Sequence, residues 1–146
     1  MSGKNGRLEK SVDGHRGACL SARWSHDGAG MVTGGEDGSV KIWSRSGMLR
    51  STLAQNAAPV YALSWSPDSQ AVLYACGHTL TIKALAPNSK PLQWRAHDAL
   101  ILCLDWSASN GKIVSGTIEC NGESPLRSET ICGEFMCPFY YGGKFV

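Results

Sequence analysis

Residues 22–28 read ARWSHDG, residues 63–69 read LSWSPDS, and residues 104–110 read LDWSASN. The tryptophans at their centres are separated by 41 residues and then by 41 again: Trp24, Trp65 and Trp106. Agreement in register at several positions is not expected by chance. The sequence therefore predicts a repeat architecture, with these three tryptophans as repeat-defining core residues.

Each repeat contains short runs of β-branched, aromatic and alternating residues between turns rich in Gly, Asp, Ser, Asn and Pro. No segment of a dozen residues keeps an apolar period of about 3.6 residues, so almost no helix is expected. The predicted strands are 18–24, 29–34, 39–43 and 48–53, then 59–65, 70–75, 79–84 and 90–95, then 100–106 and 111–116. Four short antiparallel strands every 40–45 residues or so are typical of a β-propeller blade of the WD40 type. The predicted fold is all-β: a partial WD40-type propeller of about two and a half blades with an irregular C-terminal tail.

The repeat also predicts how the chain is divided. All five Trp lie at or before residue 106, whereas all three Phe fall in the final 12 residues, so the tail differs from the repeats in composition. The expected units are an outer strand of a preceding blade (1–12), a first repeat (13–53), a degenerate second repeat (54–95), a partial third repeat (96–116) and a disordered or divergent tail (117–146). This division favours a truncated isoform or a partial gene product.

Four polar and aromatic residues of the first repeat stand where WD repeats carry a hydrogen-bonded tetrad: His15, Thr33, Asp37 and Trp43. A half-buried Asp needs donors, and an imidazole can link its carboxylate to a hydroxyl. The second repeat has other residues at this spacing, namely Asn56, Tyr74, His78 and Ala84, and the third keeps only His97 and Ser115. A catalytic interpretation of the His–Asp pair is disfavoured, because the repeat explains the spacing and no nucleophile completes a triad.

Several less general runs carry a closer resemblance: RLEKSV (7–12), GMLRSTLAQ (47–55), PVY (59–61), VLY (72–74) and LQWRAHD (92–98). Through them the chain, from about residue 6 to residue 116, resembles the intraflagellar transport protein 80 family. Members of that family are WD-repeat subunits of intraflagellar transport complex B, with two propellers and a helical solenoid. The resemblance implies a fragment of the first propeller and a non-catalytic scaffold in cilium assembly and maintenance. It also implies other complex B subunits as partners, and a location in the cytoplasm, the cilium and the ciliary base.

Loops between the strands form the faces on which a propeller meets its partners. The candidate partner-facing residues are His15, Arg16, Arg45, His97 and Asp98. Ordinary solvated turn positions are the alternative interpretation of each of them.

Composition excludes several other functions. The net charge of +2 argues against a nucleic-acid binder, whose binding face would be strongly basic. No apolar run approaches the 18–20 residues or so that span a bilayer, and the N-terminus lacks the apolar stretch of a signal peptide. We expect no cofactor, no metal, no small-molecule substrate and no membrane insertion.

Six cysteines leave one further interpretation open. Cys19, Cys76 and Cys103 are expected to be small buried hydrophobic residues. Cys120, Cys132 and Cys137 lie in the tail and could form a metal or thiol module, although a structural zinc site usually has four ligands, often as close pairs. A third hypothesis is a generic WD-repeat adaptor of a ubiquitin-ligase or signalling complex, which would have the same fold.

Overall fold

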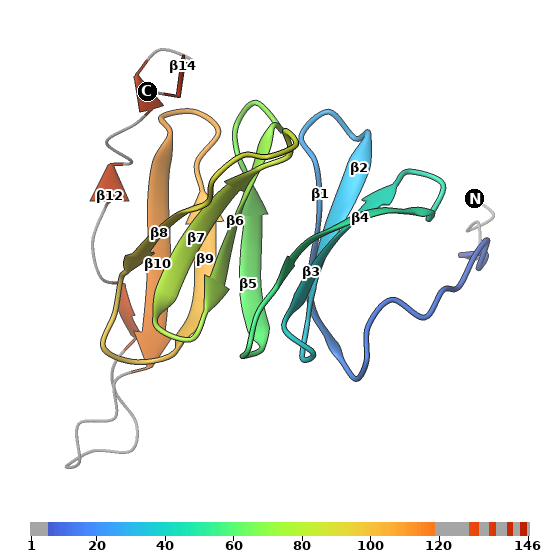
Figure 1. The fold of residues 1–146 in the computed structure, drawn as a ribbon, viewed down its shortest axis with the longest axis horizontal. Helices are drawn as coiled ribbons and strands as arrows, with labels where there is room; N and C mark the ends of the chain where they lie inside the picture. Colours follow the sequence, from blue (N-terminus) through green and yellow to red (C-terminus); the bar gives the residue numbers. More distant parts are fainter. Residues whose placement is uncertain (1–5, 119–128, 132–134, 137–139, 142–143, 146) are drawn as a thin grey trace, which may run out of the picture.

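The computed structural model describes residues 6–118, 129–131, 135–136, 140–141 and 144–145. Its regular elements are strands, and the first eight form two complete four-stranded sheets (Figure 1). The first sheet contains β1 (Cys19–Trp24), β2 (Gly30–Gly35), β3 (Ser39–Ser44) and β4 (Leu49–Gln55). The second contains β5 (Val60–Trp65), β6 (Ala71–Cys76), β7 (Thr79–Ala84) and β8 (Leu92–Arg95).

Both sheets are antiparallel meanders in which each strand pairs with the next one along the chain. A third sheet begins with β9 (Ile101–Trp106) and β10 (Lys112–Ile118). The first strands of the three sheets, β1, β5 and β9, lie side by side (Figure 1). This is the blade arrangement of a propeller, so the predicted all-β class and partial propeller are confirmed.

The first ten strands begin and end within two residues of the predicted ranges, because tight turns separate them. After β1, the Ser25 hydroxyl donates to Asp27 at 2.6 Å and accepts the Gly30 N–H at 3.1 Å. The same Ser and Asp follow β5, where the Ser66 hydroxyl donates to Asp68 at 2.5 Å. A short polar side chain that satisfies backbone groups fixes such a turn, and this turn recurs with the repeat.

An outer strand was predicted over residues 1–12, but the structure shows the described part of that range, residues 6–12, as coil. A strand is stabilised by hydrogen bonds to a neighbouring strand. Among the described residues no blade stands in front of the first sheet to supply one. The segment is held instead by contacts such as the one from Lys10 Nζ to the Ser46 carbonyl, at 3.3 Å.

Two apolar cores lie between the blades. Between the first and second blades, Val32, Val40 and Ile42 pack against Leu63 and Trp65. Between the second and third blades, Leu73, Leu80 and Ile82 pack against Leu104 and Trp106 in the same manner. The hydrophobic side chains that face an adjoining blade are thus buried.

The three repeat tryptophans do not share one environment. Trp65 and Trp106 are 3% and 2% exposed, whereas Trp24 is 55% exposed, so the prediction that Trp24 is a core residue is wrong. In the second and third blades this position faces the blade before it. Among the described residues nothing covers the corresponding face of the first blade, which we call the leading face of blade 1: Cys19, Ala22, Trp24 and Met31.

The third blade is completed differently from the first two. Its strand β10 pairs with β9 along one edge, and along the other edge with two short strands of the tail. These are β11 (Glu129–Ile131) and β12 (Phe135–Met136). The remaining pair, β13 (Tyr140–Tyr141) and β14 (Lys144–Phe145), forms a separate two-stranded sheet. Repeat spacing did not predict these strands.

The leading face of blade 1 gives a testable expectation for the isolated chain. An exposed apolar sheet face promotes association, so residues 1–146 should self-associate or be poorly soluble. Trp24→Glu should raise the monomeric fraction in sedimentation experiments, because it places a charge in that face. Arg45→Glu, at an exposed position that is not one of the four residues of the face, is the control. A monodisperse wild-type monomer would contradict the expectation.

Candidate functional site

The structure brings His15, Thr33, Asp37 and Trp43 together in one hydrogen-bonded network. His15 Nδ1 lies 3.1 Å from Asp37 Oδ1, and His15 Nε2 lies 2.7 Å from Thr33 Oγ1. The Trp43 indole N–H donates to the same Thr33 oxygen at 2.8 Å. With its proton on Nδ1, the imidazole donates to the carboxylate and accepts from the Thr33 hydroxyl, which satisfies every group.

A fifth residue, Ser39, belongs to this network and was missed from the sequence. Its hydroxyl donates to Asp37 Oδ1 at 2.7 Å and lies 2.8 Å from His15 Nδ1. Its backbone N–H donates to the same carboxylate oxygen at 3.0 Å. The available signal was an Asp-Gly-Ser run in a tight turn, because an Asp side chain in a turn commonly accepts from the residue two positions on.

The β2–β3 hairpin positions Asp37. The Gly38 N–H closes the turn on the Gly35 carbonyl at 3.1 Å, and Gly38 has a φ of +76°. A Cβ at Gly38 would meet the backbone of Asn56, and a Cβ at Gly35 would meet the His15 and Asp37 side chains. Gly38 is therefore required for its backbone conformation, and Gly35 is required because a side chain there would collide with His15 and Asp37.

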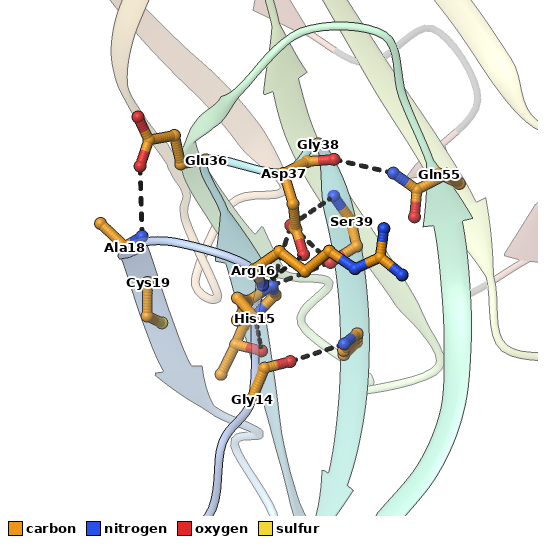
Figure 2. Close-up of polar contacts among 12 residues, drawn as sticks. Gly14, His15, Arg16, Ala18, Cys19, Glu36, Asp37, Gly38, Ser39 and Gln55 are labelled. Carbon is orange, nitrogen blue, oxygen red and sulfur yellow. Dashed lines mark hydrogen bonds and ion pairs between the residues drawn. The ribbon is translucent and has the colours of Figure 1, made fainter.

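Hydrogen bonds stabilise the charged form of Asp37. Burial by itself raises the pKa of this carboxyl. Donors from the Ser39 hydroxyl, the Arg16 and Ser39 backbone N–H groups and His15 outweigh burial and hold the pKa well below its usual range. The Arg16 N–H reaches Asp37 Oδ2 at 3.0 Å (Figure 2).

This shift predicts loss of stability in acid. The pKa of Asp37 is lower in the folded chain than the value of about 4 in the unfolded chain, so its contribution is present above about pH 4. It is lost as the pH falls below that value toward the folded pKa. Urea midpoints measured between about pH 7 and pH 3 should therefore fall more steeply for the wild type than for Asp37→Asn. Equal slopes would show that the carboxylate is not stabilised by folding.

The network has the order of a hydroxyl–imidazole–carboxylate triad, but its geometry supports a structural role. Thr33 is 5% exposed, and its oxygen already accepts the Trp43 indole N–H. A cavity of about 350 Å³ borders His15 and Thr33, and it lies on the leading face of blade 1. The corresponding face of the second blade is covered by the first.

The second blade carries a different polar group in place of the tetrad. Its hairpin is one residue shorter, because Ala75 pairs with Leu80 where Gly34 pairs with Val40. The residue paired like Trp43 is therefore Lys83, and the interpretation that placed Ala84 there is wrong. His78 lies exposed in the shortened turn.

The buried Tyr74 organises this second group. Its hydroxyl hydrogen-bonds with Thr81 and Asn56, and burial raises its pKa. Gln93 Nε2 donates to Thr81 Oγ1 at 3.1 Å. In the third blade, His97 Nε2 lies 2.7 Å from Ser115 Oγ, and both residues are buried. The three blades thus have different hydrogen-bonded polar residues at the position that the His15 network occupies in the first blade.

The candidate partner-facing residues fall at two opposite ends of the sheets. Four of them lie at the end that holds the β2–β3 hairpin: His15, Arg16, His97 and Asp98. Arg45 lies in the β3–β4 turn at the opposite end, so the structure does not bring it to the others. Arg16 and Asp98 are exposed, whereas the side chain of His15 is 2% exposed and His97 is buried. The side chains of these two histidines therefore form hydrogen bonds inside their blades and are not available to a partner.

The cysteines depart from expectation in two cases. Cys19 and Cys103 are exposed, because both lie on sheet faces that no blade covers among the described residues, and Cys76 is half-buried. The tail cysteines Cys120, Cys132 and Cys137 lie outside the described residues. Within the described part of the chain, no group of three or more His, Cys, Asp and Glu side chains could hold a metal ion. No helix described in the structure is long and apolar enough to cross a membrane.

The paired blades and their polar networks define the class of protein: the chain is part of a WD40-type β-propeller. The family of the WD domain, G-beta repeat, matches residues 6–44. A solved structure with this fold is the β-propeller domain of Myceliophteria thermophila Cps50 (Swd1), with a TM-score of 0.66 and 19% identity. The match covers 75% of this chain and 35% of that one.

A particular protein within that class is also similar. The intraflagellar transport protein 80 homolog of Mus musculus is 56% identical over 117 residues, which are 80% of this chain and 15% of the relative. The resemblance inferred from the sequence is confirmed by this identity. The F-box-like/WD repeat-containing protein TBL1X of Mus musculus is 34% identical over 59% of this chain and 16% of its own length. The chain spans less than a fifth of either relative.

Proposed function

We propose that this chain is a segment of the first propeller of a WD-repeat subunit of intraflagellar transport complex B. In that role it is a non-catalytic scaffold for protein–protein interaction in cilium assembly and maintenance. The observation that carries the proposal is the 56% identity to the intraflagellar transport protein 80 homolog over 80% of the chain. A fold shared by many WD-repeat proteins would not by itself favour one function over another.

The distribution of buried and exposed groups supports a scaffold. The His15 network holds the first blade together, and the two apolar cores hold neighbouring blades together. The loops at the two ends carry exposed charged side chains such as Arg16, Arg45 and Asp98. Conserving rigid sheets while varying the loops is how such folds present partner surfaces.

The proposed partners are other subunits of complex B, and the proposed locations are the cytoplasm, the cilium and the ciliary base. A role in nucleic-acid binding is not favoured by a net charge of +2. A small-molecule substrate is not part of the proposal.

One other function has a specific observation in its favour. The 34% identity to an F-box-like/WD repeat-containing protein fits a WD-repeat adaptor of a ubiquitin-ligase or signalling complex. That identity is lower and covers less of the chain than the similarity to the intraflagellar transport relative. The scaffold in ciliary transport is therefore preferred.

Depletion of the gene product in ciliated cells tests the preferred function. Cilia should become short or absent, and the full-length wild-type gene should restore them. A rescue gene carrying Trp65→Ala should restore them less well, because that substitution removes a buried contact between blades. Normal cilia after complete depletion would contradict the proposal.

A further inference from the structure

A polar cavity of about 370 Å³ lies beside the β2–β3 hairpin, separate from the apolar cores. The loop before β1, the hairpin with β3, and β4 all contribute to its lining: Arg16, Asp37, Ser39, Lys41, Thr52 and Gln55. Figure 2 shows the Arg16 side chain extending from the His15 loop toward the strand that carries Gln55. The cavity therefore opens next to β4.

Several hydrogen-bond donors that line this cavity have no acceptor among the described residues. Within the described residues, the Arg16 guanidinium and the Thr52 hydroxyl have no hydrogen-bond or ion-pair partner. The Lys41 ammonium donates one hydrogen bond, to the Gly14 carbonyl, which leaves two N–H groups. The cavity thus presents two cations and a free hydroxyl.

The carboxylates nearby do not neutralise these donors. Both Asp37 oxygens accept hydrogen bonds from His15, Ser39 and the Arg16 backbone. Glu36 lies on the other side of the hairpin from the Arg16 guanidinium and accepts the Ala18 N–H at 3.2 Å (Figure 2). The lining side chains carry two positive charges and one negative charge.

The Arg16 side chain begins at a fixed point. Its backbone N–H is bound to Asp37 Oδ2, and the preceding residue, His15, is locked in the buried network. A cation whose backbone is already ordered loses less entropy on binding an anion. Arginine also matches the two oxygens of a carboxylate with a planar fork of donors.

The adjacent strand indicates what kind of molecule would bring the anion. Strand β4 is the edge of the first sheet, and among the described residues only β3 pairs with it. An extended peptide can lie along such an edge and place an alternate side chain in a neighbouring pocket. A cavity with only two cations fits a single acidic side chain better than a phosphate backbone.

We propose that this cavity binds an acidic side chain of an extended segment of a partner protein, with Arg16 as its main contact. The proposal rests on the proposed function as an interaction scaffold and specifies the chemistry of one contact. The carboxylate accepts from Arg16, Lys41 and Thr52.

Fluorescence anisotropy with the full-length gene product and a labelled hexaglutamate peptide tests the proposal. Arg16→Gln should weaken binding by about tenfold or more, since a charge-assisted hydrogen-bonded pair is lost. Arg45→Gln, at the opposite end of the sheets, should leave affinity within about twofold. Arg16→Gln leaves the backbone N–H to Asp37 in place, so its thermal midpoint should equal that of the wild type.

The comparison peptide is hexaglutamine. Equal affinity for the two peptides, or equal loss with Arg16→Gln and Arg45→Gln, would overturn the proposal. Selective loss with Arg16→Gln supports it even if complex B subunits fail to co-purify, a result that would overturn only the proposed function. Conversely, co-purification with complex B but no effect of Arg16→Gln on peptide binding overturns only the cavity's role.

Discussion

Replacing Trp65 with alanine is expected to cost about 3–5 kcal/mol of unfolding free energy, the largest effect of any substitution considered. Trp65 is 3% exposed and packs in the core between the first two blades. Its indole N–H also donates to the Arg23 carbonyl of the first blade at 3.0 Å. The substitution therefore removes buried apolar area, leaves a cavity and orphans a hydrogen-bond acceptor in one step.

Trp24 is the matched control for this experiment, because it holds the same repeat position with 55% of its surface exposed. Trp24→Ala should cost less than about 1 kcal/mol, in the range of ordinary surface substitutions. Urea titrations of residues 1–146 read by pulse proteolysis, at concentrations low enough to limit association, measure both values. Similar costs for the two tryptophans would contradict the packing described between the blades.

Asp37→Ala is expected to be the second most damaging substitution, at about 1–3 kcal/mol. It removes a carboxylate that accepts from Ser39, from His15 and from the Arg16 backbone. His15 and Ser39 would remain buried without their acceptor. A buried donor left unsatisfied costs more than the average net value of a hydrogen bond.

His78→Ala provides the comparison in the second blade. His78 is exposed, and its backbone carbonyl, not its side chain, accepts hydrogen bonds from Ala96 and His97. Its substitution should cost less than about 0.5 kcal/mol. The same urea titration distinguishes the two variants, and equal costs would mean that the Asp37 network contributes nothing particular to stability.

Much of the fold could be predicted because the signals are local. Turn residues such as Asp27-Gly28 and Asp37-Gly38 mark where strands end. Because the sequence repeats every 41 residues, strand positions found in one blade predict those in the next. The four residues that meet around His15 could also be proposed, because the first repeat matches the tetrad pattern that WD repeats carry.

Other features depend on which parts of the chain surround a residue in space. The spacing of residues along the sequence gives no information about those surroundings. Trp24 has the same sequence context as Trp65, but only Trp65 has a blade in front of it. Lys83 occupies the position in the second blade that Trp43 occupies in the first, because the second hairpin is one residue shorter. A fixed period of 41 residues does not include that difference and therefore points to Ala84. The short strands β11 and β12 pair with β10 from a tail that has no repeat signal.

Affinity capture of the full-length gene product from ciliated cells, with quantitative mass spectrometry, tests whether this propeller segment belongs to a scaffold of the intraflagellar transport particle. Membership in that particle predicts that other complex B subunits dominate the recovered proteins, in stoichiometric amounts. Recovery of ubiquitin-ligase or signalling components in their place would contradict it.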